Sequence, residues 1–598
     1  MILQTVDRFD QTNINVQEKS NLIWNIADTI RGLYKPHEYG EVILPFTVIK
    51  RFHDTLLPTR DKVLEKNKEL EERGFEKKDL FLQKASGYQF YNTSPYTFDT
   101  LLADSENIEA NLRSYLYSFS ENVQDILKNF EVENEITKLA SNGKLYAVVQ
   151  EFNSPKAYMG ADKITSTDMG YIFEDLVRRF SESYNEEAGA HFTSRDIIYL
   201  MTDLLVAPHY EELVDNVGYK TVYDQTMGTS QMLSAMQERL SALDKDANID
   251  TFGQEFNPQT YAIAKADAMI RGTQAENMQL GNTLSNDKLP NFEFDYAISN
   301  PPFGVDWTAE HAIVKEEHDT QGFNGRFGPG LPRKSDGQLL FTLNSLSKLK
   351  DDGRMAIIHN GSALFTGNPG GGESEIRRFV IENDYVDAII QLPNDLFYNT
   401  GITTYIWVYD KDKSESRKGK VQLIDASNAY VSRRKNIGDK RVDLDKTTID
   451  LVLQAYNEFT DAEYEEDNQI VESKVFLNEE FGFTRVTIES PERDEEGNIV
   501  ALKNGKPKMD TSLSDTEDIP LTEDVEEYFE SEVKPFNPDA WMDRKKDKIG
   551  YEIPFTRLFY KYTAPEPADE IAERIKQLEE EIVQGFEALS GKDVSVDE

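Results

Sequence analysis

The sequence contains no cysteine among its 598 residues. That absence excludes disulfides, thiolate metal sites and thiol catalysis. The seven histidines are scattered without an H-E-x-x-H or similar spacing, so we expect no metal site. The chain also lacks G-x-x-x-x-G-K-[ST], which argues against a P-loop ATPase.

Long apolar runs are missing as well. The chain does not start with a basic stretch followed by an apolar one, and no run reaches the roughly 18 apolar residues that a membrane span needs. The sequence therefore predicts a large cytoplasmic protein with no membrane segment. Its 39% of hydrophobic residues are sufficient for packed cores.

Positive charge is scarce. The 65 Lys and Arg residues stand against 108 Asp and Glu residues, which gives a formal net charge of −43. Tight autonomous binding of DNA needs a cationic surface that displaces counterions. The charge therefore argues either against DNA as a partner or for a second protein that supplies most of the DNA affinity.

What is present divides into four parts. Residues 1–160 have helical apolar patterns and predict an all-α domain. In residues 161–430 helical and strand-like runs alternate, which predicts an α/β fold with a doubly wound, mostly parallel sheet. Residues 431–565 form a C-terminal region, and residues 566–598 a terminal amphipathic helix. The strand-like runs cover 220–223, 295–298, 354–358, 386–390 and 404–409.

The two C-terminal parts have distinct patterns. Residues 430–459 have a helical pattern, and the acidic residues 489–532 predict a solvated insertion with a hairpin turn at 503–506. The terminal helix either packs on its own domain or pairs with a helix of a partner. Its apolar residues have near-heptad spacing and are Ile571, Ile575, Leu578, Ile582 and Leu589.

The most informative stretch is Asn300-Pro301-Pro302-Phe303, which follows a predicted buried strand. Open α/β sheets bind ligands at the C-terminal ends of their strands, and two prolines stop the strand in a stiff turn. An Asn side chain, a proline carbonyl and an aromatic ring suit a flat molecule with an exocyclic amino group, such as a nucleobase. The alternative is an ordinary turn whose Phe packs into the core.

Three more predicted strand ends have polar residues or glycine. Asp224 to Gln231 links a strand to a helix through a turn of small residues, the geometry that brings a cofactor against backbone amides. Glu255 ends the second strand, where a carboxylate can accept both hydroxyls of a ribose; alternatively it is an N-terminal charge for the next helix. Asn282 follows the third strand and is a candidate for bonding an adenine ring, or a turn residue.

Taken in this order, the motifs resemble the modification subunit of type I DNA restriction-modification systems, a γ-class amino-methyltransferase. The resemblance covers most of the chain, and its order, with Thr193 before the glycine turn and the tetrapeptide after it, is typical of the γ class. The motifs are Ala190-His191-Phe192-Thr193-Ser194-Arg195, the turn 224–231, 253–255, 281–284, 300–303, 335–338 and 418–426.

Two motifs depart from the family pattern. The glycine turn of the family is close to D-P-x-x-G-S-G-G, whereas Gln225, Thr229, Ser230 and Gln231 stand here. The first motif of the family is close to E-F-Y/F-T-P-R, and here Thr193 and Arg195 remain while Ala190, His191 and Ser194 differ. The tetrapeptide is intact, which favours an active enzyme.

The resemblance implies a Rossmann-like sheet that binds S-adenosylmethionine and methylates N6 of an adenine flipped out of double-stranded DNA. The implied catalytic residues are Asn300, Pro301, Pro302 and Phe303. The implied cofactor-binding residues are Thr193, Asp224, Gly228, Thr229, Ser230, Glu255, Asn282 and Asn300.

The resemblance also implies partners. A specificity subunit would bind two modification subunits and read the DNA sequence, and a restriction/translocase subunit would join them. Two alternatives stay open: the same chemistry on RNA or on protein glutamine, and an inactive scaffold, which the altered glycine turn suggests.

Overall fold

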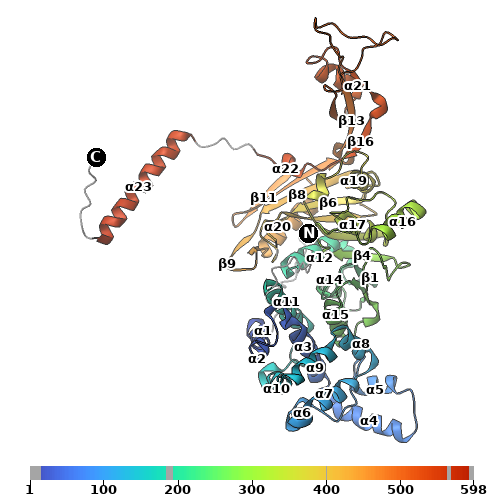
Figure 1. The fold of residues 1–598 in the computed structure, drawn as a ribbon, viewed down its shortest axis with the longest axis vertical. Coiled ribbons are helices and arrows are strands. Elements are labelled where there is room, and N and C mark those ends of the chain that lie inside the picture. The colour runs from blue at the N-terminus through green and yellow to red at the C-terminus, as the bar shows by residue number, and fades with distance from the viewer. Residues whose placement is uncertain (1–14, 184–192, 399, 562–566, 591–598) are drawn as a thin grey trace. The chain divides into compact units, whose positions relative to one another are not determined.

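The computed structural model describes residues 15–183, 193–398, 400–561 and 567–590 (Figure 1). The chain forms two compact units, Met1–Ile553 and Pro554–Glu598. Among the described residues, no helix has a long enough apolar stretch to cross a membrane.

The first part of the larger unit is helical, as predicted. Its central helix is α3 (Tyr39–Leu56), which is buried over nearly its whole length. The first half of α3 is mostly apolar, and in the second half buried charges are paired, as in Lys50 Nζ with Asp54 Oδ1 at 2.8 Å. The other α-helices of this part are α1 (Val16–Trp24), α2 (Ile26–Ile30), α4 (Arg60–Glu72), α5 (Asp79–Ser86), α6 (Phe98–Ala103), α7 (Ile108–Tyr117), α8 (Glu121–Asn129), α9 (Val132–Ser141) and α10 (Leu145–Phe152).

A ten-stranded sheet follows, after α11 (Ser166–Ser183), α12 (Arg195–Val206) and the short α13 (Tyr210–Leu213). All five predicted strands are present. The strands are β1 (Tyr219–Asp224), β2 (Asn248–Glu255), β3 (Met278–Leu280), β4 (Phe294–Ser299), β5 (Leu349–Asn360), β6 (Val386–Gln391), β7 (Thr404–Asp410), β8 (Lys420–Asn428), β11 (Ala462–Glu466) and β12 (Gln469–Leu477). The helices between them are α14 (Gln231–Leu243), α15 (Pro258–Arg271), α16 (His311–Gln321), α17 (Gln338–Ser347), α18 (Ser362–Phe365) and α19 (Gly372–Glu382).

The sheet is mixed rather than mostly parallel, with the order β11-β12-β8-β6-β7-β5-β4-β1-β2-β3. Strands β3, β2, β1, β4 and β5 are parallel, but β7 is antiparallel to both of its neighbours. The antiparallel pairing of β11 with β12 has a local cause, because parallel neighbours need a crossover, whereas these two strands are joined by a tight turn. Asp467 and Asn468 form that turn, both with positive φ (52° and 61°), as a type I′ hairpin requires.

The helical prediction for residues 430–459 is wrong in its first half. Residues 431–443 form a hairpin of β9 (Val431–Ile437) and β10 (Lys440–Asp443), and only α20 (Lys446–Glu458) is helical. Gly438 makes the turn with φ 56°, a backbone conformation that favours glycine.

A small second sheet contains the acidic segment. Strand β13 (Gly482–Glu489) pairs with β14 (Asp515–Pro520), β15 (Trp541–Met542) and β16 (Lys548–Tyr551), and the short α21 (Val525–Tyr528) follows β14. The predicted turn near Asn504 is present: Gly505 has φ 79°, and Leu502 N donates to Lys506 O at 2.8 Å.

The smaller unit contains α22 (Phe555–Leu558) and α23 (Ala568–Ser590). Of the predicted apolar residues of α23, Ile571, Ile575, Leu578 and Ile582 are between 37% and 58% exposed. Leu589 lies within α23, and residues 591–598 lie outside the described chain.

Candidate active site at the strand ends

Asp224 stands at the end of β1 and connects it to β4. Its Oδ1 accepts from Ser299 Oγ at 2.9 Å and from Thr226 N at 3.0 Å. The carboxyl group is buried, and this burial raises its pKa to about 7. The side chain therefore fixes the start of the turn and the end of β4 together.

The turn between β1 and α14 holds one glycine in a conformation that requires it. Gly228 has φ 54°, and its N–H donates to Glu255 Oε2 at 2.9 Å. Ser230 also has a positive φ, 69°, although it is not glycine, and its buried Oγ has no hydrogen-bond partner among the described residues. Thr229 is buried beside it, and the buried Thr226 Oγ1 likewise has no partner there.

Glu255 ends β2, as predicted, and faces this turn. Besides accepting from Gly228, its Oε1 accepts from Asn257 N at 2.7 Å. Burial raises its pKa. The N-cap of α15 is Asn257, whose Oδ1 accepts from Gln259 N and Thr260 N, so Glu255 does not cap the helix itself but joins the glycine turn to the N-cap residue.

Asn282 lies directly beyond β3 and has the contacts of a turn residue. Its Oδ1 accepts from Leu284 N at 2.9 Å and from Ser285 N at 3.3 Å. Its Nδ2 donates to Glu310 Oε1 at 2.9 Å. The structure therefore favours the turn interpretation, in which the side chain closes the loop after β3.

Asn300 follows β4 and meets Thr193, which lies 107 residues earlier. Asn300 Nδ2 donates to Thr193 Oγ1 at 2.8 Å. Both residues are buried, and Asn300 Oδ1 has no hydrogen-bond partner among the described residues. Because buried polar atoms are nearly always paired, this free acceptor marks a place for a donor that the described residues do not supply.

Phe303 is half-buried at the end of the tetrapeptide. Its ring meets that of Phe397 edge to face, with centroids 6.1 Å apart. Pro301 is buried and Pro302 half-buried, and Gly304 turns the chain with φ 62°. Phe397, which lies in the loop after β6, was not identified from the sequence; the Leu396-Phe397-Tyr398 run after a predicted strand was its only signal.

The replacements in the glycine turn have structural uses. Gln225, where the family has proline, donates its N–H to Ser299 Oγ at 3.3 Å, a bond that proline cannot make. Its side chain donates to Phe341 O and accepts from Asn344 Nδ2, at 2.9 and 2.8 Å, which ties the turn to α17. Gln231 bonds the buried guanidinium of Arg195 at the start of α12.

Ala190, His191 and Phe192 of the first motif lie outside the described residues. Its other residues are joined to the β9–β10 hairpin: Lys440 Nζ donates to Ser194 Oγ and Asp196 Oδ2, each at 3.1 Å. Lys440, together with the Ser194 hydroxyl, holds the pKa of the buried Asp196 below its usual range. Within the described residues, no group of three or more His, Asp or Glu could hold a metal ion.

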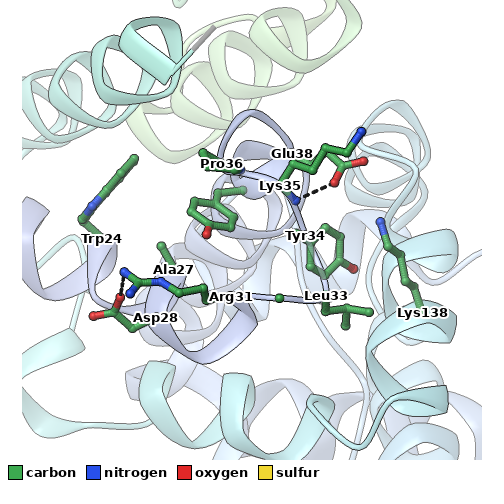
Figure 2. Close-up of a pocket in the computed structure, with 12 residues that line it drawn as sticks. Trp24, Ala27, Asp28, Arg31, Leu33, Tyr34, Lys35, Pro36, Glu38 and Lys138 are labelled. Carbon is green, nitrogen blue, oxygen red and sulfur yellow. Dashed lines mark hydrogen bonds and ion pairs between the residues drawn. The ribbon is translucent and has the colours of Figure 1, made fainter.

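A cavity lies elsewhere, in the helical domain (Figure 2). It is open, about 850 Å³ in volume, and lined by residues of α1, α2 and the loop before α3, including Trp24 and Arg31. Figure 2 shows Lys138 directed at Tyr34, with its Nζ 3.8 Å from the ring centroid. None of the sequence-predicted site residues lines it, so it is separate from the site at the strand ends.

Two family models match the chain. One, described as N-6 DNA Methylase, matches residues 165–482, and the other, the HsdM N-terminal domain, matches residues 19–152.

Two relatives from Methanocaldococcus jannaschii are similar over most of their length. The type I restriction enzyme MjaIX methylase subunit is 25% identical over 72% of this chain and 76% of its own. The MjaVII methylase subunit is 26% identical over 86% and 82%. A type I methyltransferase subunit from Streptococcus thermophilus shares the fold, with a TM-score of 0.60 at 23% identity, over 78% of this chain and 97% of its own.

Proposed function

The chain belongs to the N-6 DNA methylase family, and on that premise we propose that it is the modification subunit of a type I restriction-modification complex. It is a methyltransferase of the adenine-specific, S-adenosylmethionine-dependent class. The observation that best supports the proposal is the buried Asn300 Oδ1, which has no donor among the described residues at the end of β4.

That free oxygen suits the amino group of a flipped adenine. An amino group inside duplex DNA is inaccessible, so the base must leave the stack and its unstacking cost must be offset by contacts in a pocket. Phe303 stacks on the ring, while Asn300 Oδ1 and the Pro301 carbonyl accept the two amino hydrogens. These bonds shift the nitrogen towards sp³ and expose its lone pair, and they stabilise the ammonium that develops when the methyl group is transferred. That ammonium is acidic enough to lose its proton to solvent, so no general base is needed.

The Thr193 contact orients Asn300 for this role. Because Asn300 Nδ2 donates to Thr193 Oγ1, the amide can present only its oxygen to the amino group. Thr193 thereby acts on the reaction through Asn300 as well as on the cofactor.

The cofactor supplies an electrophilic methyl group, and the turn after β1 has the features to hold it. Glu255 is positioned for ribose hydroxyls, and Gly228 leaves the backbone of the turn open, with no atom within 4 Å of where a Cβ would stand. A polar cradle is completed by the buried Asp224 and Thr229 and by the hydroxyls of Thr226 and Ser230, which have no partner among the described residues. Asn282 would serve the adenine end only if its amide left Glu310.

The expected partners follow from the proposal that the chain is a modification subunit. We propose two modification subunits on one specificity subunit, with a restriction/translocase subunit joining them, acting on duplex DNA in the cytoplasm. This arrangement accounts for the net charge of −43, because the specificity subunit supplies most of the DNA affinity.

The decisive test is Asn300→Ala. We expect methyl transfer to DNA to fall at least about 100-fold, the usual cost of losing one donor or acceptor aimed at the transition state. Calorimetric titration should still show S-adenosylmethionine binding, weakened by no more than about tenfold, because Glu255 and the glycine turn are unchanged. Asn134→Ala, at an exposed position of α9, is the matched control and should change neither.

Other outcomes would identify the alternatives. Unchanged methylation by Asn300→Ala would contradict the mechanism. A wild-type complex that binds no S-adenosylmethionine would be a scaffold, an idea that the altered glycine turn motivates. Methylation of RNA or of protein glutamine, but not of DNA, would move the same chemistry to another substrate.

A further inference from the structure

The β9–β10 hairpin is a cationic element in an acidic chain. Its residues 431–443 include five basic side chains and only two acidic ones, whereas the whole chain has a net charge of −43. Figure 1 shows β9 at the margin of the larger unit, near α20. The basic residues are Arg433, Arg434, Lys435, Lys440 and Arg441, and the acidic ones are Asp439 and Asp443.

Two of these cations are free. Arg433 is paired with Asp443 at 2.5 Å, and Lys440 is buried. Arg434 and Lys435 are exposed, and neither side chain has a hydrogen bond or ion pair within the described part of the chain. Structural ion pairing therefore accounts for part of the hairpin's charge and leaves two adjacent cations for something outside the chain.

The strand pairing displaces those two residues from the ladder. Lys440 pairs with Ile437, but Val442 pairs with Ser432, so residues 433–436 of β9 face a single residue of β10. Such a bulge bends a strand and re-aims its side chains, and bulges are frequent beside active sites. The local geometry thus presents Arg434 and Lys435 at the surface.

The hairpin is fastened to the loops around Asn300 and Phe303. Lys440 Nζ donates to Ser194 Oγ and to Leu396 O, each at 3.1 Å. Ser194 is next to Thr193, the partner of Asn300, and Leu396 is next to Phe397, the partner of Phe303.

The turn of the hairpin makes a second attachment to the same loop. Asp439 N donates to Tyr398 O at 2.9 Å, and a Cβ on Gly438 would lie only 2.2 Å from that oxygen. The hairpin is therefore held close to the loop that follows β6, and its position is coupled to that of Phe397.

We propose that Arg434 and Lys435 bind backbone phosphates of duplex DNA next to the flipped base. This inference rests on the proposed function and adds to it the surface on which the DNA backbone is bound. A base that leaves the stack needs its flanking phosphates held in place, and two unpaired cations fixed to the target pocket supply that contact. They also offset, at this one place, the repulsion between DNA and an acidic chain.

The test compares two charge-reversal pairs in the complex that the chain forms with its specificity subunit. For Arg434→Glu with Lys435→Glu we expect duplex binding, followed by fluorescence anisotropy, to weaken at least about tenfold near 0.1 M salt. The slope of log K against log salt should become shallower by about two, one for each lost phosphate contact. Affinity for S-adenosylmethionine should not change.

The matched control is Lys503→Glu with Lys506→Glu, which makes the same change of charge at an exposed turn of the acidic segment. It should shift DNA affinity by less than about twofold, because screening removes distant effects. Arg434→Gln with Lys435→Gln should give an intermediate loss. Equal losses from both charge-reversal pairs, or no loss from the hairpin pair, would overturn the proposal.

Two further outcomes separate the hairpin from the proposed function. If the hairpin variant no longer co-purifies with the specificity subunit, the surface binds protein and the DNA proposal is wrong. If the wild-type complex methylates no DNA, the proposed function fails, and the anisotropy comparison still decides whether the hairpin contacts duplex DNA.

Discussion

At the scale of single residues, Ser230 is the clearest compromise in the glycine turn. It has φ 69° and a buried Oγ with no partner among the described residues, where the family pattern has glycine. A left-handed conformation costs a residue with a Cβ roughly 1–2 kcal/mol, so replacement by glycine removes this cost. Part of the stability gained is lost again, because glycine gives the unfolded chain more conformational freedom. We therefore predict that Ser230→Gly raises the free energy of unfolding by about 1 kcal/mol, measured as a higher thermal midpoint.

Ser230→Ala separates the cost of the left-handed backbone from the cost of the buried hydroxyl. It removes the unpaired hydroxyl but keeps the Cβ, so it should recover less stability than glycine if backbone strain dominates. A thermal midpoint for Ser230→Gly below that of wild type would show that Ser230 makes a stabilising contact that outweighs both.

Asp224 makes stability depend on pH. Burial raises its pKa from an ordinary value of 3.8 to about 7, so between these values the folded chain keeps a proton that the unfolded chain releases. Stability from this residue is therefore lost as pH rises through the window, and the full penalty is present above about pH 7. We predict that wild type loses stability relative to Asp224→Asn between about pH 4 and about pH 7, and that the difference is constant above that range.

The measurement is the difference in thermal midpoint between wild type and Asp224→Asn, taken without cofactor across that pH range. A cost of the amide in Asp224→Asn that does not vary with pH shifts the difference in thermal midpoint by a constant and leaves its dependence on pH unchanged. A difference that is flat with pH would mean that Asp224 is ionised throughout.

At the scale of elements, the strand ends were predictable because their signals are local. The apolar run that ends in Asn300-Pro301 marks where β4 stops, and the third strand was expected to end near Gly281; β4 ends at Ser299 and β3 at Leu280. The hairpin over 431–443 was missed because its cause is remote. Its Lys440 side chain is fixed by Ser194, 246 residues away, and no local pattern encodes that contact.

The site shows the same division. Glu255 and Asn300 could be found from motif order, and they meet Gly228, in the turn after β1, and Thr193, just before α12. The use of Gln225 could not be predicted, because it depends on Asn344 in α17, 119 residues away. The turn role of Asn282 was an open alternative that only its contact with Glu310 distinguishes.

At the scale of the whole molecule, α23 belongs to the smaller compact unit and has an apolar face. Ile571, Ile575, Leu578 and Ile582 are spaced three and four residues apart, so they share one side of the helix, and each is more than a third exposed. A row of exposed apolar residues on one helix face is typical of a helix that pairs with another helix. We propose that this partner is the specificity subunit.

The last prediction concerns that face. Ile575→Asp with Leu578→Asp should abolish co-purification with the specificity subunit, because two charges would be buried in an apolar interface. Gln577→Asp with Gln584→Asp adds the same charge on the opposite side of α23 and should leave the complex intact. Both variants should bind S-adenosylmethionine as wild type does, since the cofactor residues all lie in the larger unit. Co-purification of the apolar-face variant at the wild-type level would show that the complex assembles through another surface.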